Sequence, residues 1–367
     1  MSIHEMIYDE CIHNTDLIAD RLGLSDEERT QLRDISSRYP VCVTPYYLDL
    51  IDPDDPEDPI RKMCIPDVME YCDEGQEDTS GEAQNTVVTG MQHKYAPTAL
   101  ILSTNQCAMY CRHCFRKRMV GANMDEIVSD IPAIAAYVQD HPEIDNVLIS
   151  GGDAFMNSDQ VLETYLETFL SIPSIRYVRF GTRIPAVMPS RITEDPMLKI
   201  LLSEYGRTRQ IVIVTQFNHP REVTPEARKA VNYLKECGCI IRNQAVLLQG
   251  VNDDPEVLAE LMEKLVSAGV IPYYVFQCRP VKGVRNQFQV PILKGIEIID
   301  EAKSYMSGQG KCFRYAMSHP MGKLEILGKV PGQGVLFKFH QAKYDKDQSR
   351  IFFMDIAEDQ TWLPPRT

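Results

Sequence analysis

The 367-residue sequence has no long hydrophobic run. A simple membrane-spanning helix needs about 18 or more consecutive apolar residues, so none is predicted. The chain also has no excess of positive charge, because 38 Lys and Arg stand against 52 Asp and Glu, a net charge of −14. With no long basic patch, nucleic acid and anionic membranes are poor partners for it.

Cysteine is sparse for a chain of this length, with 11 residues in all. That number excludes a scaffold built on disulfides, and the crowding of three cysteines into one loop indicates a reducing compartment. The first 24 residues show no basic region followed by an apolar core, so we expect no secretory signal and a cytoplasmic protein. Beyond the strand–helix units described below, neither an internal repeat nor a low-complexity tract is evident.

The most informative stretch is Cys107-Ala-Met-Tyr-Cys111-Arg-His-Cys114, which follows an apolar run and precedes a basic cluster. Thiolates are the usual ligands of iron–sulfur clusters, and short spacings let one loop hold several irons. A four-iron cluster held by three cysteines leaves one iron open for another ligand. Two alternatives remain: three buried thiols that pack as small apolar residues, and a zinc site with His113 as fourth ligand.

From about residue 93, apolar β-rich runs alternate with helical patterns of 10–15 residues, an order typical of parallel βα units. Six such runs predict an α/β fold, a partial (β/α)6 TIM-like barrel whose chemistry lies at the carboxyl ends of its strands. The runs are Thr98–Thr104, Asn146–Ser150, Tyr177–Thr182, Gln210–Phe217, Cys239–Leu248 and Pro272–Cys278. The helical patterns are Asp125–Gln139, Ser158–Leu170, Thr224–Glu236, Asp254–Ala268 and, later, Lys294–Met306.

These patterns divide the chain into three segments. Residues 1–92 are predicted as helices followed by a proline-rich extended connector and an acidic, solvated, mobile loop (EGQEDTSGEAQ). Residues 93–280 form the partial barrel, and residues 281–367 form a C-terminal segment that closes over its mouth.

The string NQCAMYCRHCFRKR resembles the lysine 2,3-aminomutase family of radical S-adenosylmethionine (SAM) enzymes. The connector, RYPxxxTPYYLxLIDPxDPxDPxRK, is similar to the N-terminal segment of the same family, so the resemblance spans roughly residues 38–330. It implies a radical SAM barrel, a 4Fe–4S cluster on Cys107, Cys111 and Cys114, and SAM on the open iron. It further implies an electron donor such as flavodoxin or ferredoxin, an amino acid substrate and a homo-oligomer.

The resemblance also assigns the SAM site. Ser150-Gly151-Gly152-Asp153 ends the second strand, where adjacent glycines allow close approach of a ligand, although an ordinary strand-to-loop turn would look the same. The family has its GGD at this position, where backbone and acid hold the SAM amino group. By the same resemblance His219 and Gln244, at later strand ends, are expected cofactor contacts.

Three further residues match the family's substrate and pyridoxal phosphate (PLP) positions. Arg116 matches the arginine that grips the substrate carboxylate, a bidentate task suited to guanidinium. Lys323, preceded by Gly322, matches the lysine that forms a Schiff base with PLP, which makes it the catalytic candidate. Lys94 matches one of two basic residues that bind the PLP phosphate. From the sequence alone, Arg116 could equally pair with surface acids, and a lone C-terminal lysine such as Lys323 is usually a solvated surface charge.

The chain departs from the family where the substrate's side chain binds. Two aspartates hold the distal ammonium of lysine in the relatives; here Ala316 and Arg279 stand at those positions. An arginine there would repel that ammonium, so we expect a non-lysine, acidic substrate such as glutamate, with Arg279 as a substrate-binding residue. One of the two phosphate-binding basic residues is also lost, which puts PLP in question.

The sequence therefore predicts a radical SAM amino acid 2,3-aminomutase, an isomerase using a 4Fe–4S cluster, SAM and PLP. One alternative keeps the radical SAM core without PLP and performs another hydrogen-abstraction reaction. A second is a non-catalytic iron–sulfur redox or sensor protein, which would have no need of the SAM-site strand ends.

Overall fold

The computed structural model describes residues 11–122 and 125–365. Within these residues one 12-stranded sheet runs in sequence order from β1 to β12. Strands β3 to β9 pair in parallel, whereas β1, β2 and the strands after β9 pair antiparallel. The strands are β1 (Thr86–Val88), β2 (Met91–Tyr95), β3 (Thr98–Thr104), β4 (Asn146–Gly151), β5 (Tyr177–Gly181), β6 (Gln210–Thr215), β7 (Ile240–Leu247), β8 (Ile271–Gln277), β9 (Arg314–His319), β10 (Gly322–Val330), β11 (Gly334–Ala342) and β12 (Ile351–Met354).

The predicted α/β partial barrel is confirmed. The six expected strands are β3 to β8, and the sheet stays open because β3 pairs on to β2 and β9 pairs on to β10. The sequence reading missed β9, which adds a seventh parallel strand. Apolar side chains of these strands, such as Ile101, Ile149 and Phe180, are fully buried and form the core.

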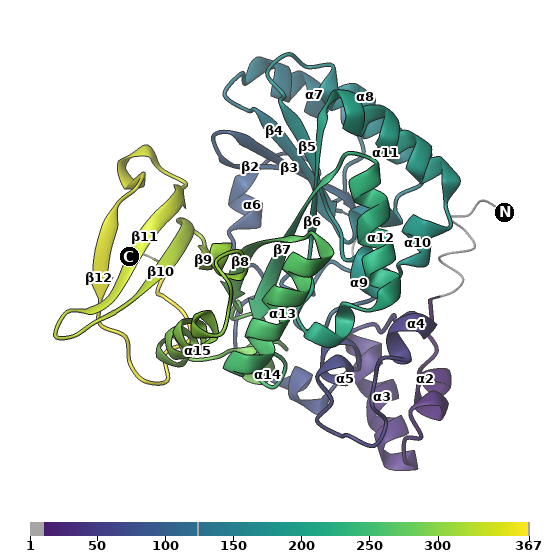
Figure 1. Cartoon of the computed structure of the whole chain (residues 1–367), viewed down its shortest axis with the longest axis vertical. Helices are drawn as coiled ribbons and strands as arrows, with labels where there is room; N and C mark the ends of the chain where they lie inside the picture. Colours follow the sequence, from purple (N-terminus) through teal and green to yellow (C-terminus); the bar gives the residue numbers. More distant parts are fainter. Residues whose placement is uncertain (1–10, 123–124, 366–367) are drawn as a thin grey trace.

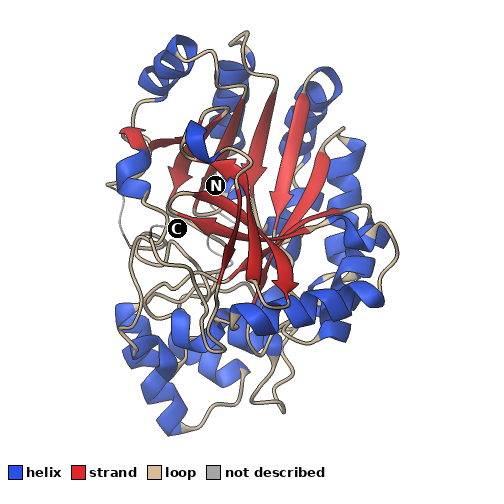
Figure 2. Ribbon diagram, turned by 90° about the vertical axis from the view of Figure 1, so that its left-hand side faces the viewer, coloured by secondary structure: helices blue, strands red, loops and turns tan. Residues whose placement is uncertain are grey.

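Helices cover the outside of the parallel strands (Figures 1 and 2). Ser158, Thr224 and Asp254 cap the helices that follow them, since each side chain accepts a backbone N–H of the first turn. Four predicted helices are confirmed within two residues at each end, whereas α7 begins later than predicted. The helices of this region are α7 (Ile131–Asp140), η2 (Ala154–Met156), α8 (Asp159–Leu170), α9 (Ile184–Val187), α10 (Ser190–Thr193), α11 (Pro196–Thr208), η3 (Pro220–Glu222), α12 (Pro225–Glu236), α13 (Pro255–Ala268), α14 (Arg285–Phe288) and α15 (Ile292–Ser304).

Most of the N-terminal segment folds against one end of the barrel, whereas its last helix lies beside β2 (Figure 1). Its elements are α2 (Thr15–Arg21), α3 (Asp26–Arg38), α4 (Pro45–Leu48), α5 (Pro59–Cys64), η1 (Val68–Tyr71) and α6 (Glu82–Asn85). The composition of the proline-rich connector predicted a segment extended over the surface, but the structure buries part of it. Val43 and Tyr47 are fully buried, and the Tyr47 hydroxyl donates to Glu222 of η3 at 2.7 Å. The prolines break the helices into short pieces, and the apolar residues between them join the core.

The C-terminal segment continues the sheet as an antiparallel wing of β10, β11 and β12 (Figure 1). Two short helical turns, η4 (Gly310–Cys312) and η5 (Asp345–Asp347), lie within this part of the chain. The wing begins at Gly322, whose φ of 153° and close approach to the carbonyl of Gln341 exclude a side chain. The division into segments 1–92, 93–280 and 281–367 stays a prediction. In the described part of the chain, no helix has the length and apolar character needed to cross a bilayer.

Candidate active site

A cavity of about 370 Å³ lies at the carboxyl ends of the parallel strands. Parallel strands bring their carboxyl ends to one edge, which is why residues far apart in sequence meet there. All but one of the predicted site residues line this cavity: Cys107, Cys111, Cys114, Gly151, Gly152, Asp153, Lys94, Arg116, Gln244, Arg279 and Lys323. The exception is His219, which is not among the lining residues. Its ring nitrogen Nδ1 accepts the backbone N–H of Arg221 at 3.3 Å.

The cysteine loop begins directly after β3 and is held in place by the N-terminal segment. The backbone N–H of Tyr110 donates to the carbonyl of Cys42, and that of Arg112 donates to the carbonyl of Met63, each at 2.9 Å. The Arg112 guanidinium donates to Glu70 (Nε–Oε1 2.7 Å), and both side chains are buried. These contacts fix the backbone of the loop, so the three thiols face the cavity from a rigid support.

The glycines after β4 are required by close backbone packing. A Cβ on Gly152 would lie 2.2 Å from the carbonyl oxygen of Gln106, at the start of the cysteine loop. Gly151 has a φ of 111°, which L side chains rarely adopt. Asp153 follows; it is buried, which raises the pKa of its carboxyl, and it accepts the backbone N–H of Arg183 at 2.6 Å. The GGD segment and the cysteine loop therefore form one wall of the cavity.

Four further cations line the cavity, Lys94, Lys323, Arg179 and Arg279, which we call the cationic wall, and the ammonium groups of its two lysines are disfavoured. Burial, reinforced by Arg179 and Arg279, lowers the pKa of Lys323 to about 7. Burial also lowers the pKa of Lys94 to about 7, with Arg279, Lys343 and Lys323 adding to the effect. Lys94 donates to the carbonyl of His319 at 2.6 Å, whereas Lys323 Nζ lies 4.4 Å from the ring centroid of Tyr274. Near neutral pH a large fraction of each amine is thus uncharged and nucleophilic.

Arg279 follows β8 and is half-buried beside Phe115, with its guanidinium carbon 4.1 Å from the ring centroid. Its Nη1 is buried and has no hydrogen-bond partner among the described residues. Burial lowers the pKa of Arg279 to about 10, although the nearby Glu82 opposes that shift. A buried guanidinium nitrogen with no acceptor is costly, and an anion in the cavity would supply one.

Glu82 corrects the prediction that the acidic loop is solvated and mobile. It opens α6, is 2% exposed, and accepts from Arg116 Nε and Arg118 Nη2 at 2.9 Å each. Burial would raise the pKa of Glu82, but Arg116 and Arg118 outweigh it and bring the value down to about 2. Arg116 thus lines the cavity, yet it already holds a carboxylate. Composition alone could not place Glu82, because its partners lie 34 and 36 residues away.

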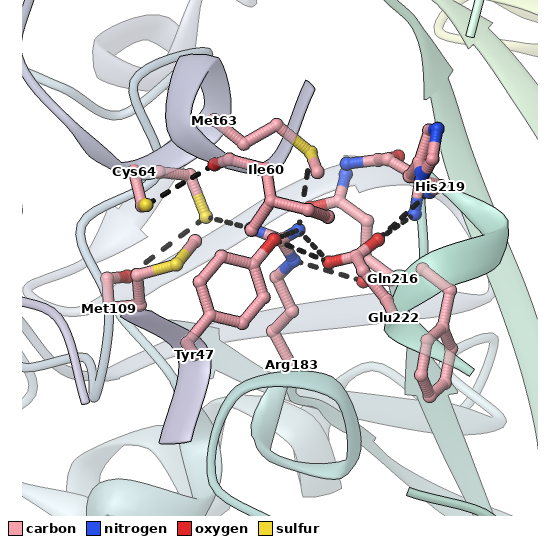
Figure 3. Close-up of polar contacts among 12 residues, drawn as sticks. Tyr47, Ile60, Met63, Cys64, Met109, Arg183, Gln216, His219 and Glu222 are labelled. Carbon is pink, nitrogen blue, oxygen red and sulfur yellow. Dashed lines mark hydrogen bonds and ion pairs between the residues drawn. The ribbon is translucent and has the colours of Figure 1, made fainter. Parts of the chain in front are cut away.

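Two arginines, one in the third parallel strand and one just after it, were not among the predicted site residues. Arg179 in β5 lines the cavity, its Nη2 lies 3.5 Å from Thr98 Oγ1, and its buried Nε has no partner within the described part of the chain. Arg183, two residues after β5, donates to the Cys111 sulfur at 2.9 Å and to Glu222 at 2.5 Å (Figure 3). The sequence could have pointed to them only through their positions, Arg179 within a predicted strand and Arg183 just after it. Many arginines with a purely structural role share such positions.

Comparison with known proteins identifies relatives. A profile described as the Radical SAM superfamily matches residues 101–262. A protein of Aquifex aeolicus (strain VF5), provisionally named an L-lysine 2,3-aminomutase, is 38% identical over 346 residues, 94% of this chain and 92% of that protein. L-lysine 2,3-aminomutase of Clostridium subterminale is 40% identical over 290 residues, covering 78% of this chain and 68% of the relative. Glutamate 2,3-aminomutase of Clostridioides difficile (strain 630) is 35% identical over 322 residues, covering 87% and 73%.

Proposed function

The chain belongs to the lysine 2,3-aminomutase family of radical SAM enzymes, and from this premise we propose that it is an amino acid 2,3-aminomutase for an acidic substrate such as glutamate. Membership makes it an enzyme of the isomerase class, which excludes the non-catalytic sensor alternative. Membership also implies a 4Fe–4S cluster and SAM as cofactors. Which residues hold them, and whether PLP joins them, are parts of the proposal.

The cluster and SAM are assigned to the wall formed by the cysteine loop and the GGD segment. Cys107, Cys111 and Cys114 come from one loop, line one cavity and lie on a fixed backbone, which suits a cluster with one open iron. Backbone at Gly151 and Gly152, together with the Asp153 carboxylate, would hold the SAM amino group, and Gln244 faces the same space. SAM bound at such a cluster supplies a 5′-deoxyadenosyl radical that can remove a substrate hydrogen.

PLP fits the cationic wall. Lys323 is the nucleophile, because its amine is buried and its pKa is about 7. Lys94 and Arg179 are the candidates for the phosphate; both line the cavity, and Arg179 would take the place of the family's missing second basic residue. Arg179 Nε lacks an acceptor, which phosphate oxygen would provide. When bound to a substrate amine, PLP supplies the electron-delocalising group across which nitrogen can shift between neighbouring carbons.

Arg279 carries the proposal for the substrate class. Its Nη1 has no hydrogen-bond partner among the described residues, so an anion bound there would satisfy it. The charge of Arg279 would also repel the distal ammonium of lysine. The carboxylate of an acidic side chain would supply the acceptor. The named function of the Clostridioides difficile relative, glutamate 2,3-aminomutase, supports an acidic substrate in this family. Arg116 is assigned to the other substrate carboxylate, which would share or displace Glu82.

Two further assignments rest on the family resemblance rather than on a site. The cluster needs a low-potential electron donor, for which a flavodoxin or ferredoxin is proposed. A homo-oligomer is also proposed.

A second candidate function keeps the radical SAM chemistry and omits PLP. The observation that favours it is the loss of one of the family's two phosphate-binding basic residues, which leaves Lys94 alone. Under this alternative Lys323 and Arg179 would contact the substrate directly.

Absorbance spectroscopy separates the two. The anaerobically reconstituted wild-type protein and Lys323→Ala are titrated with PLP, with Lys282→Ala, an exposed lysine paired with Glu77, as control. The proposal expects a visible band of covalently held PLP in the wild type and control, absent from Lys323→Ala and removed by borohydride. No band at any PLP concentration would contradict the PLP mechanism and favour the alternative.

A further inference from the structure

Arg183 lies at a junction of three parts of the chain. It follows β5, and its guanidinium contacts the N-terminal segment, the loop after β6 and the cysteine loop (Figure 3). Nε donates to the carbonyl of Gln216 at 3.0 Å, and Nη2 donates to Glu222 at 2.5 Å and Tyr47 Oη at 3.3 Å. Nη1 donates to the sulfur of Cys111 at 2.9 Å.

The contact with sulfur is not needed to stabilise the buried charge. Glu222 is fully buried and already balances Arg183; the backbone N–H groups of Asn218 and His219 hold its other oxygen at 2.6 and 2.9 Å. Gln216 and Tyr47 supply further acceptors. Nη1 of Arg183 nevertheless donates to the sulfur of Cys111, a thiol that we assign to the cluster. Hydrogen bonds to cluster sulfurs and the charge around them are the means by which a protein sets the reduction potential.

We propose that Arg183 is a positioning residue that raises the reduction potential of the cluster through Cys111, and that Glu222 sets how much of its positive charge reaches the sulfur. The inference rests on the proposed assignment of Cys111 as a cluster ligand. One-electron reduction makes the cluster more negative, and the electron comes from the external donor. A cationic hydrogen-bond donor on a cluster thiolate stabilises that added charge. A carboxylate 2.5 Å from the same guanidinium partly cancels the effect.

This arrangement predicts shifts of opposite sign for two neighbouring residues. Arg183→Gln removes the cation and leaves the Glu222 charge, so the reduction equilibrium should move at least tenfold toward the oxidised form. That is about 59 mV lower for one electron. Glu222→Gln leaves the cation uncompensated, so the equilibrium should move toward the reduced form. Arg183→Lys retains the charge and should lie between Arg183→Gln and the wild type.

The experiment is an anaerobic redox titration of the reconstituted full-length protein, followed by electron paramagnetic resonance of the reduced cluster. SAM is left out, so a contact between Arg183 and SAM cannot produce the shift. Arg191→Gln is the matched control, because Arg191 is also a buried arginine and pairs with the carboxylates of Asp159 and Asp195, whereas its hydrogen bonds include none to a sulfur of the cysteine loop among the described residues. Iron and sulfide content is measured for every variant.

Opposite shifts in Arg183→Gln and Glu222→Gln, with Arg191→Gln at the wild-type potential, would support the inference. If Arg183→Gln does not hold a cluster, the potentials of Arg183→Lys and Glu222→Gln decide. Unchanged potentials, or shifts of the same sign in the Arg183 and Glu222 variants, would overturn it. A wild-type protein that binds no iron and sulfide would instead overturn the cluster assignment within the proposed function.

Discussion

The two walls of the cavity treat buried charge differently. On the cluster wall both buried arginines that line the cavity have a carboxylate partner: Arg183 with Glu222, and Arg116 with Glu82. On the cationic wall Lys94, Lys323, Arg179 and Arg279 are half-buried, and among the described residues none of the four forms an ion pair with a carboxylate. Lys94 and Lys323 respond with a pKa near 7.

The difference indicates what each wall is built to receive. A buried charge without a partner is costly and is normally neutralised or paired. The cluster wall is balanced by itself and would accept cofactors without taking up further charge. The cationic wall has a deficit of anions, and the phosphate of PLP and the carboxylates of an acidic substrate would supply the balancing negative charge.

The largest effect is expected on the cluster wall. Cys111→Ala removes one of three assigned ligands, so we expect complete loss of the cluster signal and of SAM cleavage. Iron and sulfide analysis with electron paramagnetic resonance measures it. Cys312→Ala is the control, since Cys312 is exposed. A full cluster in Cys111→Ala would show that this wall has another purpose.

Gly152→Ala tests the close packing of the same wall. Its Cβ would lie 2.2 Å from the carbonyl oxygen of Gln106, so the GGD segment or the cysteine loop must move. A misplacement of about 1 Å can cost about 100-fold, and we expect SAM affinity to fall by that order. Isothermal titration against Gly308→Ala, whose Cβ meets nothing within 4 Å, isolates the effect. Equal affinities would indicate that SAM does not rely on this segment.

Arg279→Met tests the anion deficit of the cationic wall. A hydrogen bond to a charged group contributes about 1.5–3 kcal/mol, so kcat/KM for an acidic amino acid should fall about 10- to 100-fold. Arg279→Asp should in addition improve turnover of lysine relative to glutamate. Arg285→Met is the control, because Arg285 is largely exposed and pairs with Glu74 at 3.5 Å. An unchanged preference in both Arg279 variants would place the specificity elsewhere.

The smallest effect concerns stability. Burial, with Arg179 and Arg279, lowers the pKa of Lys323 to about 7, whereas in the unfolded chain it stays near 10.4. Between these values the unfolded state binds more protons, so this lysine makes stability rise with pH from about 7 to 10. Lys323→Met should raise the melting temperature at pH 7 by a few degrees and flatten its dependence on pH.

Thermal unfolding at several pH values, with wild type and Lys323→Met compared at each, measures this. Other groups titrate in both proteins, so the difference between them isolates Lys323. A difference that does not shrink as pH rises would contradict the low pKa.

The sequence predicts the backbone of this site better than its charges. Strand β3 matches its predicted bounds, and the cysteine loop and Gly151-Gly152-Asp153 lie on one cavity as expected, because short motifs at strand ends are local features. Glu82 was misread because an acidic, glycine-bearing stretch usually stays in water. Its burial depends on arginines more than 30 residues away. Arg183 was missed for the same reason: its partners Tyr47 and Glu222 come from two distant segments.

His219 shows the limit of transferring a role by position. It sits in the expected strand-end loop, yet it does not line the cavity, and its Nδ1 accepts the backbone N–H of Arg221 instead. Side-chain direction in such a loop is decided by contacts that the sequence does not show.

The most direct test of the account is an isomerisation assay. The fully reconstituted enzyme, with SAM, PLP and a reductant, is incubated separately with glutamate, aspartate and lysine, and β-amino acid products are identified by nuclear magnetic resonance. The account predicts a β-amino acid from an acidic substrate, no more than trace conversion of lysine, and loss of conversion in Lys323→Ala and Arg279→Met. Efficient conversion of lysine, undiminished in Arg279→Met, would contradict it.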